Sequence, residues 1–466
     1  MNCDYDLLLA GGHVLLENGL DRKDIAIRGG RITGILEPGA IVPANRRIDI
    51  TGKYLLPGVL DVHFHVRAPS YPERGTVLTE TRAAAAGGVT TIFEMPISKP
   101  CCNSAAVLES RRRHFATEAV VDFALYGAPG ASDSADVRAM ANAGAVAFKI
   151  FTTAPPPKRD DEFAGLSLPD EMPQYETLRR VAETGRLLVV HAESEPLMAQ
   201  FMARARATGR RDADAHLMSR PDIVEAVAIA KIATMARQTG TRMHIAHVTC
   251  RAGVDVIRAF QAIGTDVSAE TCPHYLLFTN DDVARVGSDA KINPPIRTAD
   301  DRDALWGGIA DGTITIVTTD HAPFSKREKD AAGDDMLAAP PGSPGVEFLL
   351  PFMLDAVASG RLPLKNAVDL VTVNGARRFD VHPRKGTIRE GSDADLVVVD
   401  LERATIVEPA KLFTAARQVA GLYAGRRFQG AIEMTIVGGR PVFENGEITV
   451  PPGTGRFLAG GKAGAR

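Results

Sequence analysis

The chain has 466 residues, and its 54 Lys and Arg against 57 Asp and Glu give a formal net charge of −3. It therefore lacks the basic excess of a general nucleic-acid binder, and we expect no nucleic-acid partner. Hydrophobic residues make up 45% and charged residues 24%, which is typical of a folded globular protein. No apolar run approaches the roughly 20 residues that span a bilayer, so no membrane partner is expected either.

The beginning of the chain and its cysteines bear on location. Residues 1–9 include Asp4 and Asp6 and no basic segment, unlike a secretory signal. The cysteines are odd in number and show no paired metal-binding spacing; they are Cys3, Cys101, Cys102, Cys250 and Cys272. Reduced thiols in the cytoplasm are the simplest interpretation.

The two ends of the chain resemble each other. Residues 11–19 and 438–446 each combine β-branched or alternating apolar residues with an Asn-Gly turn, which is hairpin chemistry. Residues 24–28 and 395–400 add further strand patterns. We predict one small β-sandwich built from residues 1–57 and 385–466, with residues 58–384 inserted between; two unrelated hairpins are the alternative. From Gly453 onward the Gly-rich, basic sequence predicts a frayed tail.

Short apolar segments alternate with helix-like stretches between these ends. Eight such segments are apolar enough to be buried on both faces, as parallel strands are: 60–66, 89–94, 121–126, 145–151, 187–191, 242–247, 266–270 and 313–319. Eight strand-and-helix repeats predict an α/β fold, a (β/α)8 TIM barrel. A doubly wound open sheet is less favoured because no G-x-G-x-x-G follows the first strand.

Side chains that bind metals occur where several of these strands end. His63 and His65 are two residues apart, which places both imidazoles on one face of an extended chain. His191 and His247 end the fifth and sixth strands, and Asp320 directly follows the eighth. Any one of these histidines could be an ordinary core residue. Because a barrel gathers its strand ends around one mouth, the set together predicts a metal site.

Lys149 is a charged residue within the apolar fourth strand. Burying an unpaired ammonium group is costly, so this amine should be paired, deprotonated or chemically modified. An inward Lys paired with a carboxylate is the plain interpretation. The functional one is a lysine carboxylated on its amine, whose carboxylate could hold two metal ions.

This constellation resembles the cyclic-amidohydrolase branch of the amidohydrolase superfamily, whose members include dihydropyrimidinase (hydantoinase), allantoinase and dihydroorotase. The resemblance covers nearly the whole chain and rests on the residues above together with motifs at 57–63, 84–91, 270–275, 293–297, 319–323, 385–388 and 391–395. It implies a barrel with a small β-sandwich from both termini.

The resemblance also implies the ligands of a binuclear metal centre. Two divalent ions, with Zn²⁺ favoured and Mn²⁺, Co²⁺ or Fe²⁺ left open, would be held by His63, His65, Lys149, His191, His247 and Asp320. The first two histidines would bind the more buried ion, the other two the more exposed ion, and CO2 would supply a bridging carbamate on Lys149. Asp320, which contacts the first ion, would also be catalytic: it would take the proton of a metal-bound hydroxide that attacks a ring carbonyl, and pass it to the leaving nitrogen.

The substrate is predicted from weaker signals. Arg67 completes a His-x-His-x-Arg resembling dihydroorotase, and Asn293 resembles a position whose backbone contacts the cyclic amide. However, Ile97 and Phe324 stand at two positions where dihydroorotases bind a carboxylate, and no Tyr follows Lys149 as in dihydropyrimidinases. We therefore expect an allantoinase-like or hydantoinase-like enzyme acting on a cyclic ureide or imide, with dihydroorotase or dihydropyrimidinase activity as alternatives.

The remaining expectations concern secondary roles. His244 should face away from His247 and be structural, since the two are an odd number of residues apart; His274 and His321 should orient neighbours. Residues 152–171 form either a substrate-gating loop or a surface excursion. Relatives of dihydropyrimidinase that lost the metal ligands act as scaffolds, which is the non-catalytic alternative. The resemblance also implies a homotetramer or homodimer.

Overall fold

The computed structural model describes residues 4–130 and 133–461. All eight predicted internal strands are present: β6 (Val59–Phe64), β7 (Val89–Glu94), β8 (Asp122–Leu125), β9 (Phe148–Phe151), β10 (Leu188–His191), β11 (Met243–Ile245), β12 (Val267–Thr271) and β13 (Ile316–Val317). They form two parallel sheets, β6-β7-β8 and β9-β10-β11-β12-β13. Most are shorter than predicted, several of them at the beginning as well as at the end.

Isolated parallel bridges connect these two sheets at both sides. Gly127 pairs with Phe148 between the ends of β8 and β9, and Phe64 pairs with His321 between β6 and the segment after β13. The carboxyl ends of all eight strands therefore lie at the same side of what we call the eight-strand unit, β6–β13 with their helices.

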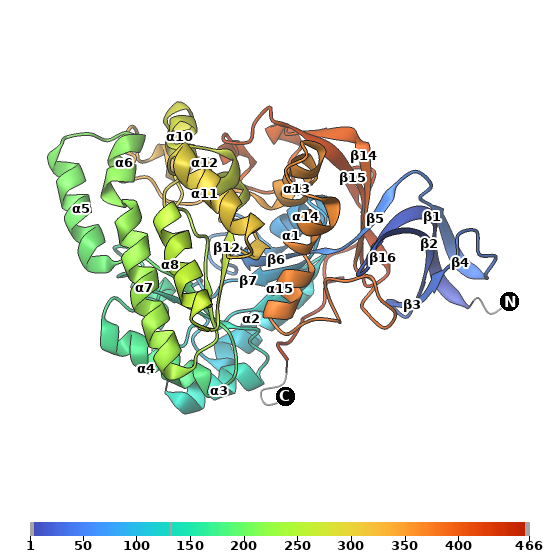
Figure 1. The fold of residues 1–466 in the computed structure, drawn as a ribbon, viewed down its shortest axis with the longest axis horizontal. Coiled ribbons are helices and arrows are strands. Elements are labelled where there is room, and N and C mark those ends of the chain that lie inside the picture. Colours follow the sequence, from blue (N-terminus) through green and yellow to red (C-terminus); the bar gives the residue numbers. More distant parts are fainter. Residues whose placement is uncertain (1–3, 131–132, 462–466) are drawn as a thin grey trace.

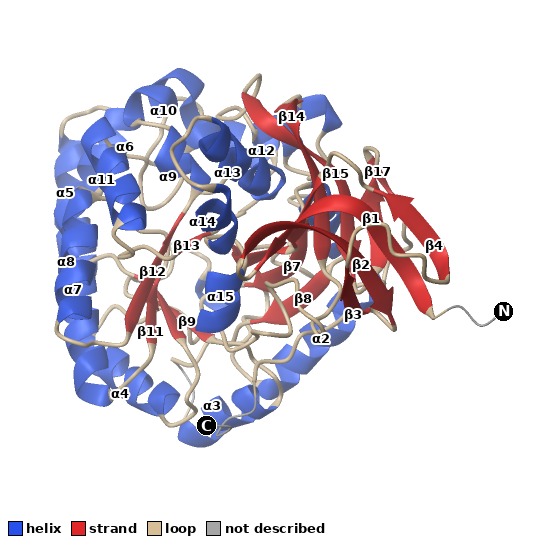
Figure 2. Cartoon of the chain, turned by 45° about the vertical axis from the view of Figure 1, so that its right-hand side comes forward, coloured by secondary structure: helices blue, strands red, loops and turns tan. Residues whose placement is uncertain are grey.

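In the sequence, helices alternate with these strands. In space they cover the outer side of the unit, as Figure 2 shows for α4, α7 and α8. The helices are α1 (Val77–Ala86), α2 (Ala105–Glu118), α3 (Ser134–Asn142), α4 (Glu171–Ala182), α5 (Glu195–Ala207), α6 (Ala213–Ser219), α7 (Asp222–Thr239), α8 (Arg251–Ala262), α9 (Pro273–Leu277), α10 (Asn280–Val286), α11 (Ala299–Ala310), α12 (Lys326–Asp330), α13 (Leu349–Ala358), α14 (Leu364–Asp369) and α15 (Val373–Arg378). Within the described residues, none of these helices has the length and apolar character needed to cross a membrane.

The interior between the strands is filled by a compact apolar cluster. Its members come from strands far apart in the sequence and include Leu60, Val62, Phe93, Val189 and Ile316. The predicted metal ligands lie beyond this cluster, at or near the carboxyl ends of the strands.

Both ends of the chain meet in a single nine-stranded sheet beside the eight-strand unit (Figure 1). Its strands are β1 (Tyr5–Leu16), β2 (Gly19–Arg28), β3 (Arg31–Leu36), β4 (Ala44–Asp49), β5 (Tyr54–Pro57), β14 (Leu396–Ile406), β15 (Arg427–Val437), β16 (Arg440–Glu444) and β17 (Glu447–Ile448). The predicted Asn-Gly turns both connect paired strands. In the second, Asn445 and Gly446 have φ of 53° and 88°, as a type I′ turn requires.

A buried lysine connects the nine-stranded sheet to the eight-strand unit. Lys385 donates to Asp122 at the start of β8 and to Asp395 just before β14. Although burial opposes the charge, these carboxylates raise the pKa of Lys385 above its usual value. The ammonium group is therefore paired with carboxylates from both parts of the molecule.

The prediction of a frayed tail after Gly453 is wrong for residues 453–461, while residues 462–466 lie outside the described part of the chain. The Gly455 N–H donates to Ala119 O at 2.8 Å, and the Leu458 N–H donates to Phe123 O at 2.7 Å. Leu458 is only 2% exposed and belongs to the apolar cluster between the strands. The glycines allow the backbone to approach β8 closely: a Cβ on Gly455 would lie 2.0 Å from the carbonyl oxygen of Val121. Glycine here indicates close packing, which the composition of the tail did not reveal.

Of the predicted free thiols, Cys101, Cys102, Cys250 and Cys272 are buried and free, and Cys3 lies outside the described residues.

Replacing Leu458 by Ala should destabilise the protein by about 2–5 kcal/mol, because it removes buried methyl groups and leaves a cavity among the strands. The measurement is the shift of the denaturation midpoint. The control is Ile406→Ala at a side chain that is 57% exposed, where a change within about 0.5 kcal/mol is expected. Equal midpoints for the two variants would mean that Leu458 does not contribute to the apolar cluster between the strands.

Candidate metal centre

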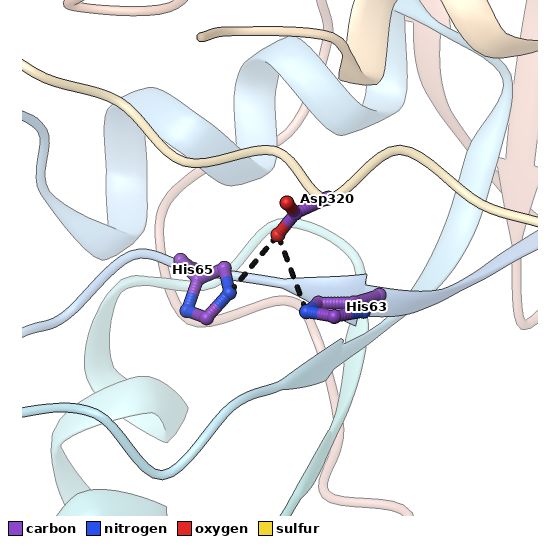
Figure 3. A group of neighbouring side chains, drawn as sticks. All are labelled: His63, His65 and Asp320. Atoms are coloured by element: carbon purple, nitrogen blue, oxygen red, sulfur yellow. Dashed lines mark ion pairs between the residues drawn. The ribbon is translucent and has the colours of Figure 1, made fainter. Parts of the chain in front are cut away.

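Two histidines of β6 and the following segment converge with an aspartate (Figure 3). The Nε2 atoms of His63 and His65 each lie 3.2 Å from Oδ1 of Asp320. All three ligand atoms lie within 4.8 Å of one another, a spacing at which one metal ion could be shared. The predicted placement of both imidazoles on one face agrees with this geometry.

The other two predicted ligands lie beside this group. Nδ1 of His191 and Nε2 of His247 are 2.9 Å apart. The ring of His247 is also 5.2 Å, between centroids, from that of His63. Four imidazoles from β6, β10 and the segment after β11 thus form one cluster.

Lys149 enters the same cluster from β9 with its amine unsatisfied. The side chain is fully buried, and its Nζ has no hydrogen-bond partner among the described residues. Nζ lies 5.3 Å from the centre of the Phe151 ring, which stacks on His191 at 4.4 Å. Burial lowers the pKa of this amine to about 8. The paired-lysine interpretation therefore has no partner to support it.

The backbone is strained at two predicted metal ligands and at the predicted substrate contact Arg67. The φ angles of Arg67, His247 and Asp320 are 61°, 33° and 46°, in a region that residues other than glycine rarely adopt. Such conformations persist only where the surrounding structure enforces them, and they gather at functional sites.

Glu270 fixes the orientation of His63 and was not predicted as a functional residue. Its carboxylate accepts hydrogen bonds from Nδ1 of His63 and, at 3.0 Å, from Nε2 of His244. These hydrogen bonds lower the pKa of Glu270 although its complete burial opposes ionisation. With Nδ1 occupied in this way, Nε2 of His63 is left to face Asp320.

The prediction that His244 faces away from the site is therefore wrong, although its role is structural. The alternation of faces ends with β11 at Ile245, two residues before His247, so the count of residues no longer decides the side. His321, by contrast, donates to Glu80 at 2.8 Å and accepts from the Gly345 N–H, as an orienting residue would. Nε2 of the buried His274 has no partner among the described atoms.

A second carboxylate, also missed, orients His191. Glu193 accepts from Nε2 of His191 at 2.8 Å and from the guanidinium of Arg220. This leaves Nδ1 of His191 to face His247. The His-Ala-Glu sequence at 191–193 carries the signal, since a ligand histidine needs a partner for its second nitrogen.

Burial favours the neutral form of three of the site histidines. It lowers the pKa of His65 to about 3 and lowers the pKa values of His191 and His247 as well. Neutral imidazole is the form that binds metals.

One cavity of about 510 Å³ is lined by all the predicted metal ligands except Lys149. Both predicted substrate contacts, Arg67 and Asn293, also line it. Ile97 lines it as well. Phe324 is not among its lining residues; its ring lies 4.7 Å from the guanidinium carbon of Arg67. Phe324 therefore supports Arg67 rather than facing a ligand.

The loop after β9 also borders the cavity. Residues 153–157 and Arg159 are among its lining residues. Two ion pairs involve this loop, Arg159 with Glu162 and Asp161 with Lys99. The gating role of this loop stays a prediction.

The donors fit divalent metal ions. Four buried imidazoles and a carboxylate converge. In His63 and in His191, one ring nitrogen is hydrogen-bonded to a carboxylate, and the other nitrogen is left for a metal. Nζ of Lys149, buried beside them without a partner, is the atom a bridging carbamate would use. Ligands of this kind suit zinc and its neighbours.

Comparisons with known proteins agree with this chemistry. The amidohydrolase family model matches residues 54–442, and the chain belongs to that family. It is 36% identical to an allantoinase of Solibacter usitatus over 96% of each chain, and 33% identical to an L-hydantoinase of Paenarthrobacter aurescens over 97% of this chain and 98% of the relative. A solved L-hydantoinase (dihydropyrimidinase) from Arthrobacter aurescens superposes with a TM-score of 0.92 at 32% identity, covering 98% of this chain and all of the other.

Replacing Glu270 by Ala should weaken metal binding about 10- to 100-fold, because His63 loses the acceptor that orients it. Glu270→Gln, which keeps an acceptor oxygen, should lose less. The measurement is the metal content after dialysis against a chelator of graded strength. Glu402→Ala, on the exposed face of β14, is the control. Unchanged metal affinity in Glu270→Ala would show that this carboxylate does not position His63.

Proposed function

We propose that this metal-dependent cyclic amidohydrolase opens the ring of a cyclic ureide, as an allantoinase or hydantoinase does. The observation that carries the proposal is the convergence of four buried histidines, Asp320 and the unpartnered Lys149 at a cavity of about 510 Å³. This volume is within the range of small-molecule sites. The names of the relatives, allantoinase and L-hydantoinase, support the choice of ring.

In this proposal the centre holds two divalent ions, zinc being favoured by the ligands. Their ligands are His63, His65, His191, His247, Asp320 and a carbamate on Lys149. The carbamate would form when the neutral amine of Lys149 adds to CO2 and loses a proton, so that the buried amine would become an anion able to hold metal ions. Bound there, the ions supply Lewis acidity, which polarises a carbonyl group and acidifies water.

Asp320 moves the proton in the proposed reaction. Its carboxylate faces both His63 and His65 and also lines the cavity. As general base it accepts the proton of the attacking water, and as general acid it returns that proton to the ring nitrogen when the C–N bond breaks. Water addition to the carbonyl thus yields an acid and a free ureido nitrogen.

Arg67 and Asn293 are the proposed substrate contacts. Arg67 Nη1 donates to Pro323 O at 2.9 Å, which holds the guanidinium in place at the cavity wall. Its remaining N–H groups can meet a ring carbonyl. Oδ1 of Asn293 faces Nε2 of His216 at 2.9 Å, so the Asn293 side chain is engaged and its backbone is the part left for the cyclic amide.

The finer architecture is part of the same proposal. The bridges at Gly127 and Phe64 support closure of the eight-strand unit into a (β/α)8 barrel within residues 58–384. The nine-stranded sheet supports a β-sandwich from residues 1–57 and 385–466. A homotetramer or homodimer and a cytoplasmic location, the latter supported by the free buried thiols, complete it.

Replacing Asp320 by Asn should lower kcat by about 100-fold or more, because the amide has the same shape but cannot accept the proton. Metal content should fall less than in His63→Ala, which removes an imidazole outright. Both quantities are measured on the same preparations. Normal turnover by Asp320→Asn would place the base elsewhere.

A comparison of kcat/KM for allantoin, hydantoin, dihydrouracil and dihydroorotate tests the substrate. We expect allantoin or hydantoin to be best and dihydroorotate to be about 100-fold poorer, because Ile97 cannot hydrogen-bond a ring carboxylate held near Arg67. If dihydroorotate is the best of the four, the substrate assignment is wrong. If none is opened by zinc-loaded protein, the hydrolase proposal itself fails.

A further inference from the structure

The cavity has a cationic side that the proposed reaction does not use. Arg206 on α5, Arg220 after α6 and Lys291 before the Asn293 turn all line it. We call these three residues the cationic wall. It begins close to the metal centre, since Arg220 shares the carboxylate of Glu193 with His191.

Lys291 is the least accessible member of the wall. It is only 5% exposed, and its Nζ donates to a single partner, Leu337 O, at 2.9 Å. A lysine ammonium has three donors, so two remain. Burial, followed by the nearby charges of Arg220, Lys329 and Arg206, lowers the pKa of Lys291 to about 7.

Lys329 holds Lys291 in this position. The Nζ atom of Lys329 donates to Lys291 O at 3.1 Å and to Pro340 O at 2.9 Å, and its side chain is fully buried. Leu337 and Pro340 themselves line the cavity. The ammonium of Lys291 is thus built into a supported wall rather than attached to a mobile surface chain.

The positive charge of the wall is only partly compensated. Among the described residues, no carboxylate lies within ion-pair distance of Arg206 or Lys291, and only Asp335 offsets the charge of Lys291 from further away. Glu193 is shared between Arg220 and His191, and Glu195 accepts from the Ala154 N–H at 2.8 Å. Lys291 is buried, Arg220 is half-buried and Arg206 is exposed, and the positive charge of Lys291 and Arg206, which have no ion-pair partner in the described part of the chain, favours an anion in the cavity.

We propose that the cationic wall is a subsite for an anionic substituent, a carboxylate on a short arm attached to the ring of the substrate. The inference rests on the proposed function, because the reacting ring is taken to lie at the metal centre. The carboxylate then accepts hydrogen bonds from Lys291 and the two arginines. Glu193 lies between this subsite and His191. A carboxylate attached directly to the ring near Arg67, as in dihydroorotate, would not use this wall.

The test uses pairs of hydantoins that differ only in charge at the end of the arm. Each enantiomer of 5-carboxymethylhydantoin and 5-(2-carboxyethyl)hydantoin is compared with its carboxamide on the zinc-loaded enzyme. For at least one arm length, kcat/KM should be about 10-fold or more higher for the acid than for the amide, and the ratio should fall with added salt. Equal or lower values for the acids would overturn the inference while the opening of neutral hydantoins still supports the proposed function.

Variants then assign the effect to the wall. Lys291→Met and Arg206→Gln should each reduce the acid-to-amide ratio several-fold; a ratio taken within one preparation does not depend on how much protein is folded. Lys231→Met, on α7 and paired with Glu171 outside the cavity, should keep the wild-type ratio. A ratio unaffected in both wall variants would overturn the assignment.

A binding measurement keeps the inference testable even if no ring is opened. Calorimetric titration of the zinc-loaded protein should then show tighter binding of the acid than of the amide, again lost in Lys291→Met. Equal binding of the two would contradict the subsite, whereas the missing turnover would contradict only the proposed function.

Discussion

The burial of a single amine without a partner shapes the active centre. Lys149 is enclosed by aromatic and histidine side chains in the fourth strand, where an ammonium group would be strongly disfavoured. Its pKa of about 8 keeps part of the amine neutral under ordinary conditions. Burial also lowers the pKa values of His65, His191 and His247, so it favours the neutral nitrogens that can form covalent or coordinate bonds.

Two neighbouring carboxylates orient the buried histidines. Glu270 and Glu193 each take one nitrogen of a histidine, which directs the other nitrogen into the centre. Glu193 also accepts from Arg220, so the carboxylate that orients His191 is shared with the cationic side of the cavity. The orientation of His191 and the position of Arg220 in the cationic wall are therefore linked through one side chain.

Much of this arrangement could be predicted from the sequence. Apolar segments interrupted by polar residues located all eight strands, and the spacing of His63 and His65 placed them on one face. Paired contacts between distant segments could not be found in this way: Glu270 lies in a motif that marked the family, but nothing in its neighbourhood indicates that it reaches His63, about two hundred residues earlier. The same holds for Phe324, whose apolar character was evident but whose place behind Arg67 was not.

Local rules failed where tertiary contacts replaced them. Alternation along β11 does not extend to His247 because the strand ends first, and this reversed the expected side of His244. The glycines after Gly453 predicted fraying, but Gly455 instead permits close contact with the start of β8. Leu458 then packs in the apolar cluster, which the overall composition of the tail did not indicate.

The most direct test of the two-ion centre is a ¹³C NMR spectrum of metal-free protein reconstituted with zinc and ¹³C-labelled bicarbonate. The spectrum should show one carbamate resonance with about two zinc ions per chain. In Lys149→Ala the resonance, the second ion and the activity should be lost, and a short carboxylic acid that replaces the bridge should restore part of the activity. A fully active Lys149→Ala enzyme that binds two ions and lacks the resonance would contradict the account.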